Sequence, residues 1–294
     1  PTSLRIVNWV KMALSGYDLS AEAVQSIAVQ ARWLTKRLEW LLLGNHLFVN
    51  AKALMFAGHF FQGPEADSWR HTAARILAKQ IPEQILPDGG QFELSPMYHA
   101  LALEDVLDLI NAWNTFRGNL NAMEEELLEI CRRLAPKMLG WLDVMSHPDG
   151  RISFFNDAAF GIAPENDELH AFSGRLGFVR TTELTSPSLK HLKESGYARL
   201  KATDALLIAD VANVGPDYLP GHAHADTLSF ELSVFGQRVF VNSGTSEYGI
   251  GTERQRQRST AAHNTVEVAG ENSSEVWAGF RVARRARITS LSSG

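Results

Sequence analysis

The chain has 294 residues, of which 45% are hydrophobic and 21% are charged, a composition typical of soluble globular proteins that bury a sizeable core. Its 28 basic and 33 acidic side chains give a net charge of −5 without a long basic run, which argues against a nucleic-acid partner. A single cysteine, Cys131, excludes an internal disulfide and a cysteine-based metal cluster. No apolar run is long enough to cross a bilayer.

The first half of the sequence has a helical texture. Apolar residues recur at helical spacing, Ser20 is suited to cap a helix, and Pro64 and Pro96 stand where a first turn tolerates proline. The pattern predicts helices over Leu4–Leu14, Ala21–Leu43, Asn45–Phe61, Glu65–Gln80, Pro96–Phe116 and Met123–Met145, with a kink at Pro136. We therefore expect residues 1–150 to form an all-α domain of layered helical hairpins. Because the chain starts at Pro1 already in a helical pattern, we also expect a longer parent protein.

The second half changes to short apolar runs between turn residues, after a loop-like stretch over residues 151–174. We predict strands over Leu176–Arg180, Tyr197–Lys201, Ala205–Val211, the run after His224, Arg238–Val241, Asn264–Val268 and Phe280–Ile288. Gly236-Gln237 is the expected two-residue hairpin turn. No helical segment separates these runs, so residues 151–294 are expected to form an antiparallel sheet, arranged as a sandwich and cut short at its end.

The stretch PGHAHADTLSFELSVF, residues 220–235, is the strongest candidate for a functional site. His222 and His224 stand two residues apart at the start of a strand in which apolar and polar residues alternate. In an extended chain both imidazoles project to one face, which suits a metal pair or a base beside a metal ligand. A polar strand end without function explains an isolated His-x-His at least as well. The functional interpretation therefore depends on the other motifs of the chain.

Two motifs place polar side chains at helix starts. In GNHLFVNAKAL, Asn45 and His46 open a helix, where backbone N–H groups favour anions; simple capping is the alternative. In DGGQFELSPMYHALALED, Tyr98 and His99 fall in the first helical turn, after a loop that carries Glu93. Both sets can meet at one mouth of a helical barrel.

A third motif, RSTAAHNTVEV, has His263 at the start of an expected strand. A hairpin pattern brings Asn242 beside the strand of His224, so the three side chains can converge from neighbouring strands. Two imidazoles with an amide or carboxylate oxygen and water form a plausible tetrahedral zinc set. Aspartate would be a stronger third ligand than Asn242, because an amide brings no charge.

Acidic residues offer a different enzyme class. Paired carboxylates among Asp88, Glu93, Glu104 and Asp105 suit a glycoside hydrolase. For Glu104, Asp105 and Asp108, capping and solvated-face roles are the favoured interpretation.

Taken together, the motifs resemble a known family. GNHLFVNAKALMFAG, DGGQFELSPMYHALALEDVLDLIN, GHAHADTLSFEL and AAHNTVEV are similar to sequences of the heparinase II/III-like polysaccharide lyases, in particular to members found among bacterial exopolysaccharide genes, and the resemblance runs from about Ser3 to Ile288. It implies an incomplete (α/α) toroid followed by an antiparallel β-sandwich, and β-elimination on a uronic-acid-containing polysaccharide. It also implies a periplasmic or secreted location, with a cytoplasmic one as the alternative.

The resemblance further implies roles for single residues. β-Elimination removes the sugar C5 proton beside a carboxylate that resists a second negative charge, so a neutral or cationic donor has to bind that carboxylate. Asn45 matches the asparagine that neutralises it, and His46 is its neighbour. Tyr98 matches the tyrosine that protonates the leaving glycosidic oxygen and can also abstract the proton. His222 matches the catalytic histidine, either a base or a second neutralising group.

The metal site is implied in the same way. His224 and His263 match two ligands of a Zn²⁺ ion, and Asn242 stands where the metal-binding relatives have an aspartate. This departure puts the metal in doubt.

An acidic protein that binds an acidic polymer needs a local positive surface. We predict substrate contacts from His99 and Glu93, and from Arg254 and Arg258 of TERQRQRST, for which a solvated loop is the alternative. Lys52 is a further candidate cation. A polysaccharide-binding or assembly factor without turnover is the non-enzymatic alternative.

Overall fold

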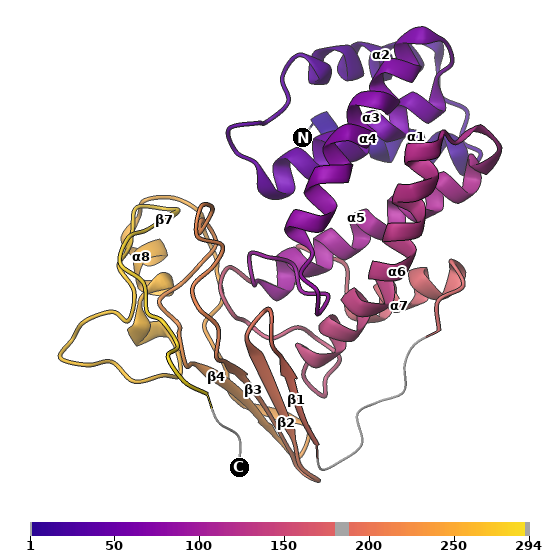
Figure 1. Ribbon diagram of the computed structural model, residues 1–294. Coiled ribbons are helices and arrows are strands. Elements are labelled where there is room, and N and C mark those ends of the chain that lie inside the picture. The colour runs from indigo at the N-terminus through magenta and orange to yellow at the C-terminus, as the bar shows by residue number, and fades with distance from the viewer. Residues whose placement is uncertain (1, 180–187, 292–294) are drawn as a thin grey trace. The chain divides into compact units, whose positions relative to one another are not determined.

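The computed structural model describes residues 2–179 and 188–291 (Figure 1). The chain divides into two compact units. The first comprises Pro1–Gln84 and Asp105–Arg133, and the second comprises Ile85–Glu104 and Leu134–Gly294. The division does not fall at one point of the sequence, because α5 (Pro96–Thr115) and α6 (Ala122–Val144) each contribute to both units.

The first unit is helical, as the sequence predicts. It contains α1 (Thr2–Leu14), α2 (Ala21–Thr35), α3 (Gly44–Phe60), α4 (Pro64–Gln84), parts of α5 and α6, and a short 3-10 helix over Arg117–Asn119. Nearly every residue of α3 is buried, so this helix is the centre of the unit. Gly58 lets α4 approach closely, since a Cβ at this position would lie 2.4 Å from Cγ of Arg70.

The predicted extension of α2 to Leu43 is wrong, because the helix ends at Thr35. The side chain of Asn50, in α3, binds the segment that follows Thr35 and so prevents it from continuing the helix. Its Oδ1 accepts the backbone N–H of Glu39 at 2.9 Å, and its Nδ2 donates to Oε2 of Glu39 at 2.8 Å. Residues 36–43 therefore form a turn that closes on the carbonyl oxygen of Glu39. The apolar residues that mimicked a helical stripe lie on this turn, and Leu41 is 98% exposed.

A buried ion cluster joins α4 to α6 in the first unit. Arg70 donates to both carboxylate oxygens of Glu124, with Nε 2.9 Å from Oε1, and Nε2 of His59 lies 3.3 Å from the same oxygen. Burial works to raise the pKa of Glu124, but the contacts with Arg70 and His59 outweigh it and lower the pKa to about 2.

Glu124→Gln is expected to lower the free energy of unfolding by about 1–3 kcal/mol at neutral pH, because Arg70 loses its counter-charge. The folded pKa of Glu124 lies below its ordinary value of 4.5, so this stabilisation is complete above that value and is lost as the pH falls toward 2. Urea denaturation of both proteins across this range checks it. A difference in stability that stayed constant with pH would contradict the assignment.

The second unit carries the antiparallel sheet (Figure 1). Its strands β1 (Ser188–Leu192), β2 (Tyr197–Lys201), β3 (Ala205–Asp210), β4 (Phe230–Val234) and β5 (Gln237–Phe240) lie side by side in sequence order. A second, two-stranded sheet pairs β6 (Val276–Trp277) with β7 (Arg281–Val282). The hairpin turn between β4 and β5 is one residue earlier than predicted, at Phe235-Gly236, and both residues have the positive φ of a type I′ turn.

Several strand predictions in this unit are wrong. Leu176 caps the end of α7 (Asn166–Arg175), a helix that starts with a capping box of Glu165 and Glu168 where a loop was expected. Asn264–Val268 forms no strand, and α8 (Thr252–Arg258) with a 3-10 helix over Thr260–Ala262 precedes it. β7 covers only two residues of the predicted Phe280–Ile288 run. Arg180 lies outside the described residues.

The alternation in β4 is present, but its polar face is the more deeply buried one. Glu231 and Ser233 are 0% and 1% exposed. His147 accounts for this, since its Nε2 lies 2.7 Å from Oε2 of Glu231 and its Nδ1 lies 2.7 Å from Oγ of Ser233. A buried polar strand face is stable when each group has a hydrogen-bond partner. β4 is therefore fixed to the segment that carries His147 through a polar network.

Candidate active site

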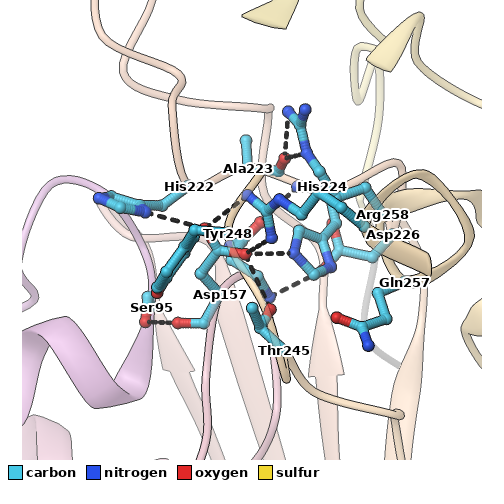
Figure 2. Close-up of polar contacts among 12 residues, drawn as sticks. Ser95, Asp157, His222, Ala223, His224, Asp226, Thr245, Tyr248, Gln257 and Arg258 are labelled. Carbon is cyan, nitrogen blue, oxygen red and sulfur yellow. Dashed lines mark hydrogen bonds and ion pairs between the residues drawn. The ribbon is translucent and has the colours of Figure 1, made fainter. Parts of the chain in front are cut away.

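The second unit brings Tyr98 and His222 into ring contact. Their ring centroids lie 3.9 Å apart with an interplanar angle of 29°. Tyr98 is placed by the start of α5, where its backbone N–H donates to Oγ of Ser95 at 3.2 Å. The Ser95 hydroxyl in turn donates to the carbonyl oxygen of Asp157 at 2.5 Å (Figure 2). Two residues 124 positions apart in sequence, 222 − 98, thus share one site.

Two carboxylates flank the imidazole of His222. Its Nδ1 lies 2.8 Å from Oδ2 of Asp157, and its Nε2 lies 3.3 Å from Oε2 of Glu93. The side chain of His222 is 13% exposed and that of Glu93 is 3% exposed. His222 is therefore the more exposed of the two side chains, and Glu93 is almost completely buried beside it.

The phenol of Tyr98 is held in its protonated form. Burial, followed by the neighbouring Tyr248, raises the pKa of Tyr98 well above its ordinary value. The two phenol oxygens lie 3.1 Å apart, and burial also raises the pKa of Tyr248. Tyr98 therefore carries its proton in this state.

Asp157 is the hub of the site (Figure 2). Its carboxylate contacts both histidines of the His-x-His motif and accepts hydrogen bonds from Oγ1 of Thr245 at 2.8 Å and from the guanidinium of Arg254. Burial alone would raise the pKa of Asp157, but the hydrogen bonds from His222, His224 and Arg254 hold it well below its ordinary value. The carboxylate is therefore ionised although it is buried.

Behind the hub, His224 and His263 form an inner pair. Nδ1 of His224 lies 3.2 Å from Nε2 of His263, and burial lowers the pKa of His263 to about 4. Asn242 stands behind His263, since its Oδ1 accepts the backbone N–H of Asn264 at 3.4 Å and lies 3.2 Å from Nδ1 of His263. Its amide nitrogen is buried without a hydrogen-bond partner. Asn242 therefore orients one imidazole and does not face the gap between the two.

This donor set fits a small cation only in part. Two ligands of one tetrahedral zinc ion, bonded at about 2.0–2.1 Å, lie about 3.3 Å apart, close to the separation of the facing nitrogens. Among residues 2–179 and 188–291, however, no three His, Cys, Asp or Glu side chains are grouped as a metal site. The protein offers two imidazole nitrogens, and water would have to complete the coordination.

The predicted substrate-binding arginines are internal clamps in this structure. Arg254 and Arg258 are both 0% exposed. Arg254 binds Asp157 and also donates to the carbonyl oxygen of Gly279. Arg258 donates to the carbonyl oxygen of Ala223, at 2.9 Å from Nη2 (Figure 2). The first seven residues of TERQRQRST form helix α8, which turns both guanidinium groups inward. Arg258 holds the chain between His222 and His224 at Ala223, and Arg254 holds the carboxylate of Asp157.

His99 also lacks access to a ligand. It is fully buried, its Nδ1 accepts the backbone N–H of Gln91, and its Nε2 donates to the carbonyl oxygen of Met138 at 2.9 Å. Burial lowers the pKa of His99 to about 4. Gln91 donates to Oε1 of Glu93, so His99 supports the loop that presents Glu93 and does not contact a substrate itself.

The carboxylates proposed for a glycoside hydrolase have other partners. Asp88 accepts hydrogen bonds from Gly90 and from Ser195. Asp105 belongs to the first unit and binds the ammonium group of Lys52 at 2.6 Å. Glu93 faces His222, as described above. Asp88, Glu93 and Asp105 are thus each held by a different partner, which does not favour the paired carboxylates of hydrolysis.

Asn45 and His46 belong to the first unit, at the start of α3. Asn45 is half-buried, and the side chain of His46 is 51% exposed. Nδ1 of His46 lies 3.3 Å from Oε1 of Glu39, the residue held by Asn50. The turn over residues 36–43 thus orients the imidazole of His46, and Leu43 reaches the helix start with a φ of 55°.

Sequence reasoning missed Asp157, Tyr248 and Phe280. The ring of Phe280 lies 6.2 Å from that of His222 and stacks on Tyr248 at 5.7 Å, with the guanidinium carbon of Arg254 5.5 Å from its centroid. Asp157 is a lone acid in an aromatic loop, so no spacing marks it. Of the three, only Tyr248 stands out in the sequence, as an aromatic residue in the run of small and polar residues that follows Asn242.

Both halves of the sequence have known relatives. The sequence matches the family models described as Heparinase II/III N-terminus over residues 12–167 and Heparinase II/III-like, C-terminal over residues 184–294. It is 29% identical over 253 residues to a heparin-sulfate lyase of Bacteroides stercoris, covering 78% of this chain and 36% of that protein. A heparin-sulfate lyase of Pedobacter heparinus is 29% identical over 255 residues, with the same coverage of 78% and 36%. The chain thus spans about a third of the length of these relatives.

Solved structures identify the fold. The crystal structure of heparinase III aligns with a TM-score of 0.74 at 21% identity, covering 92% of this chain and 47% of that one. This confirms the predicted class of an incomplete (α/α) toroid followed by an antiparallel β-sandwich. None of the helices in the described part of the chain has the length and hydrophobicity of a membrane span. With both family models matched across most of its length, the chain belongs to the heparinase II/III family.

Proposed function

We propose that this chain is the catalytic part of a polysaccharide lyase that cleaves a uronic-acid-containing polymer by β-elimination. The observation that carries the proposal is the ring contact between Tyr98 and His222, with a protonated phenol beside an imidazole held by Asp157. An acid and a base on one face of a site are what elimination needs.

The reaction divides into two proton transfers. The base removes the proton at C5 of the uronic acid, the electron pair of that C–H bond forms the C4–C5 double bond, and the C4–O bond breaks. The glycosidic oxygen leaves with the electrons of the broken bond and takes a proton from the acid. Each transfer by a positioned side chain contributes about 10²–10⁴-fold to the rate.

We assign the acid to Tyr98 and the base to His222. The raised pKa of Tyr98 keeps its proton available for the leaving oxygen. His222 accepts the C5 proton at Nε2, and the resulting imidazolium lies between Asp157 and Glu93. Two carboxylates stabilise that cation, as the aspartate does in a serine-protease triad.

Asn45 and His46 keep the roles that the resemblance implies. An amide at Asn45 would neutralise the uronate carboxylate, and His46, oriented by Glu39, would contribute a second donor. These two roles are independent of the roles assigned to Tyr98 and His222, and substitutions of Asn45 and of His46 test them separately.

The proposed substrate is an acidic polysaccharide outside the cytoplasm, and heparan sulfate is the first polymer to test because the relatives are named heparin-sulfate lyases. Phe280 and Tyr248, 46% and 48% exposed, offer a stacked aromatic surface beside His222 for a sugar ring. Location in the periplasm or outside the cell, and a place among exopolysaccharide genes, remain part of the proposal.

The direct test is incubation of the full-length protein with uronate polymers while ultraviolet absorbance is recorded. Elimination leaves an unsaturated uronate that absorbs, so absorbance rises with time if the proposal is correct. Polymer binding without any rise, on every uronate polymer tested, would overturn the lyase proposal in favour of a binding or assembly factor.

We also propose that the inner pair holds Zn²⁺, through Nδ1 of His224 and Nε2 of His263. When bound, the ion would act as a fixed positive charge that cross-links the two segments. Asn242 would hold His263 in place from behind. The catalytic steps above do not pass through this ion.

Added Zn²⁺ is expected to raise the free energy of unfolding by about 2.7 kcal/mol at a hundred times its Kd. His263→Gln should abolish this increase, whereas His71→Gln, at an exposed position of the first unit, should keep it. Thermal unfolding with and without chelator measures the effect. Equal responses of all three proteins to zinc would contradict the site.

A further inference from the structure

One carboxylate serves both histidines of the His-x-His motif. Oδ2 of Asp157 lies 2.8 Å from Nδ1 of His222, and Oδ1 lies 2.8 Å from Nε2 of His224 (Figure 2). The two oxygens thus meet opposite ring nitrogens. We propose that Asp157 is a positioning residue that fixes opposite tautomers on the two histidines and so divides the motif between two tasks. The task given to His222 rests on the proposed function, whereas the tautomers do not.

Asp157 can act in this way because it is an obligate acceptor. An ionised carboxylate offers lone pairs and no proton, and Arg254 keeps it ionised through a buried two-point contact, with Nη2 2.8 Å from Oδ2. Each imidazole nitrogen that faces the Asp157 carboxylate must therefore carry a hydrogen. His222 is protonated on Nδ1, and His224 is protonated on Nε2.

The free nitrogens then point to different places. Nε2 of His222 lies 3.3 Å from Oε2 of Glu93, on a side chain that is 13% exposed, and it is the nitrogen that would take the proton under the proposed function. Nδ1 of His224, which is 0% exposed, is left facing Nε2 of His263. The outer histidine is thereby available for chemistry, and the inner one for a ligand role or for cross-linking. Without Asp157, other contacts of each ring would decide which of its nitrogens carries the hydrogen.

The backbone holds Asp157 independently of its side chain. Its N–H donates to the carbonyl oxygen of His222 at 3.0 Å, and its carbonyl oxygen accepts the hydroxyl of Ser95. The preceding residue, Asn156, has a φ of 56° and donates from Nδ2 to the carbonyl oxygen of Leu94 at 3.0 Å. A substitution at the carboxylate therefore changes the acceptor while leaving these backbone contacts available.

The wild-type protein gives the first test, through long-range ¹H–¹⁵N correlation spectra of histidine-labelled full-length protein at alkaline pH. His222→Gln and His224→Gln identify the two rings. We expect His222 to show its hydrogen on Nδ1 and His224 on Nε2. A hydrogen on Nε2 of His222, or on Nδ1 of His224, would overturn the proposal. This result does not depend on turnover, so it separates the proposal from failure of the lyase function.

Asp157→Asn gives the second test, because an amide nitrogen cannot accept a hydrogen bond. At least one of the two rings should change tautomer, and kcat should fall by about 10²–10⁴-fold with a smaller change in KM. Asp149→Asn is the matched control, since it breaks another two-point aspartate–arginine contact, with Arg238, that includes no imidazole. A folded Asp157→Asn protein with unchanged tautomers would contradict the proposal. If that variant does not fold, the wild-type spectra decide.

Discussion

Tyr98→Phe is expected to lower kcat by about 10²–10⁴-fold, with polymer binding retained. The substitution removes only the phenol oxygen, the atom that lies 3.1 Å from the Tyr248 hydroxyl, and it keeps the ring stacked on His222. Because the raised pKa holds the proton on Tyr98, its loss leaves the departing glycosidic oxygen without a donor. Initial rates by ultraviolet absorbance give kcat, and calorimetric titration with the polymer gives binding.

Tyr17→Phe is the control for this variant, because Tyr17 is 66% exposed in the first unit and should leave kcat unchanged. Tyr248→Phe distinguishes the two phenols of the site. Full activity of Tyr98→Phe, or a loss of turnover confined to Tyr248→Phe, would show that Tyr98 does not supply the proton and would contradict the mechanism.

Lys52→Met is expected to lower the free energy of unfolding by about 3–5 kcal/mol. The side chain of Lys52 is 4% exposed, and its ammonium group lies 2.6 Å from Oδ1 of Asp105 and 2.5 Å from Oδ2 of Asp108. Burial acts to lower the pKa of Lys52, but the two carboxylates more than offset this and raise it. Methionine would leave the buried Asp105 without its cation and Asp108 with only Lys11, and removing one partner of a buried ion cluster is strongly destabilising. Chemical denaturation measures the loss.

Lys11→Met separates burial from charge. Lys11 also binds Asp108, at 2.6 Å, but its side chain is 36% exposed, so its removal should cost about 1 kcal/mol or less. The triple variant that adds Asp105→Asn and Asp108→Asn to Lys52→Met should recover part of the stability. If Lys11→Met and Lys52→Met were equally destabilised, Lys52 would not be the centre of the cluster.

The order of helices and strands was predictable because each depends on local periodicity. α3 and the strands β2, β3 and β4 follow from patterns a few residues long. The errors arose where a distant side chain decides the local structure. α2 ends early because Asn50 binds Glu39, and β4 buries its polar face because His147 binds Glu231 and Ser233. Neither partner lies within the window that periodicity reads.

The candidate site divides in the same way. Tyr98 and His222 were identifiable from motifs, and the structure places them in contact. Arg254 and Arg258 were read as substrate contacts because charged runs are usually exposed, yet helix α8 turns both inward to bind Asp157 and Ala223. Lys52, the further candidate cation, is instead buried against Asp105 and Asp108. Asp157 could not be found, because its importance lies in partners 65 to 97 residues away.

Mass spectrometry of the products from a defined uronate oligosaccharide tests the central claim most directly. If Tyr98 and His222 carry out β-elimination, the two fragments together have the mass of the substrate, and one of them carries an unsaturated uronate. Fragments that together weigh one water more than the substrate would show hydrolysis, and would contradict the roles assigned to both residues.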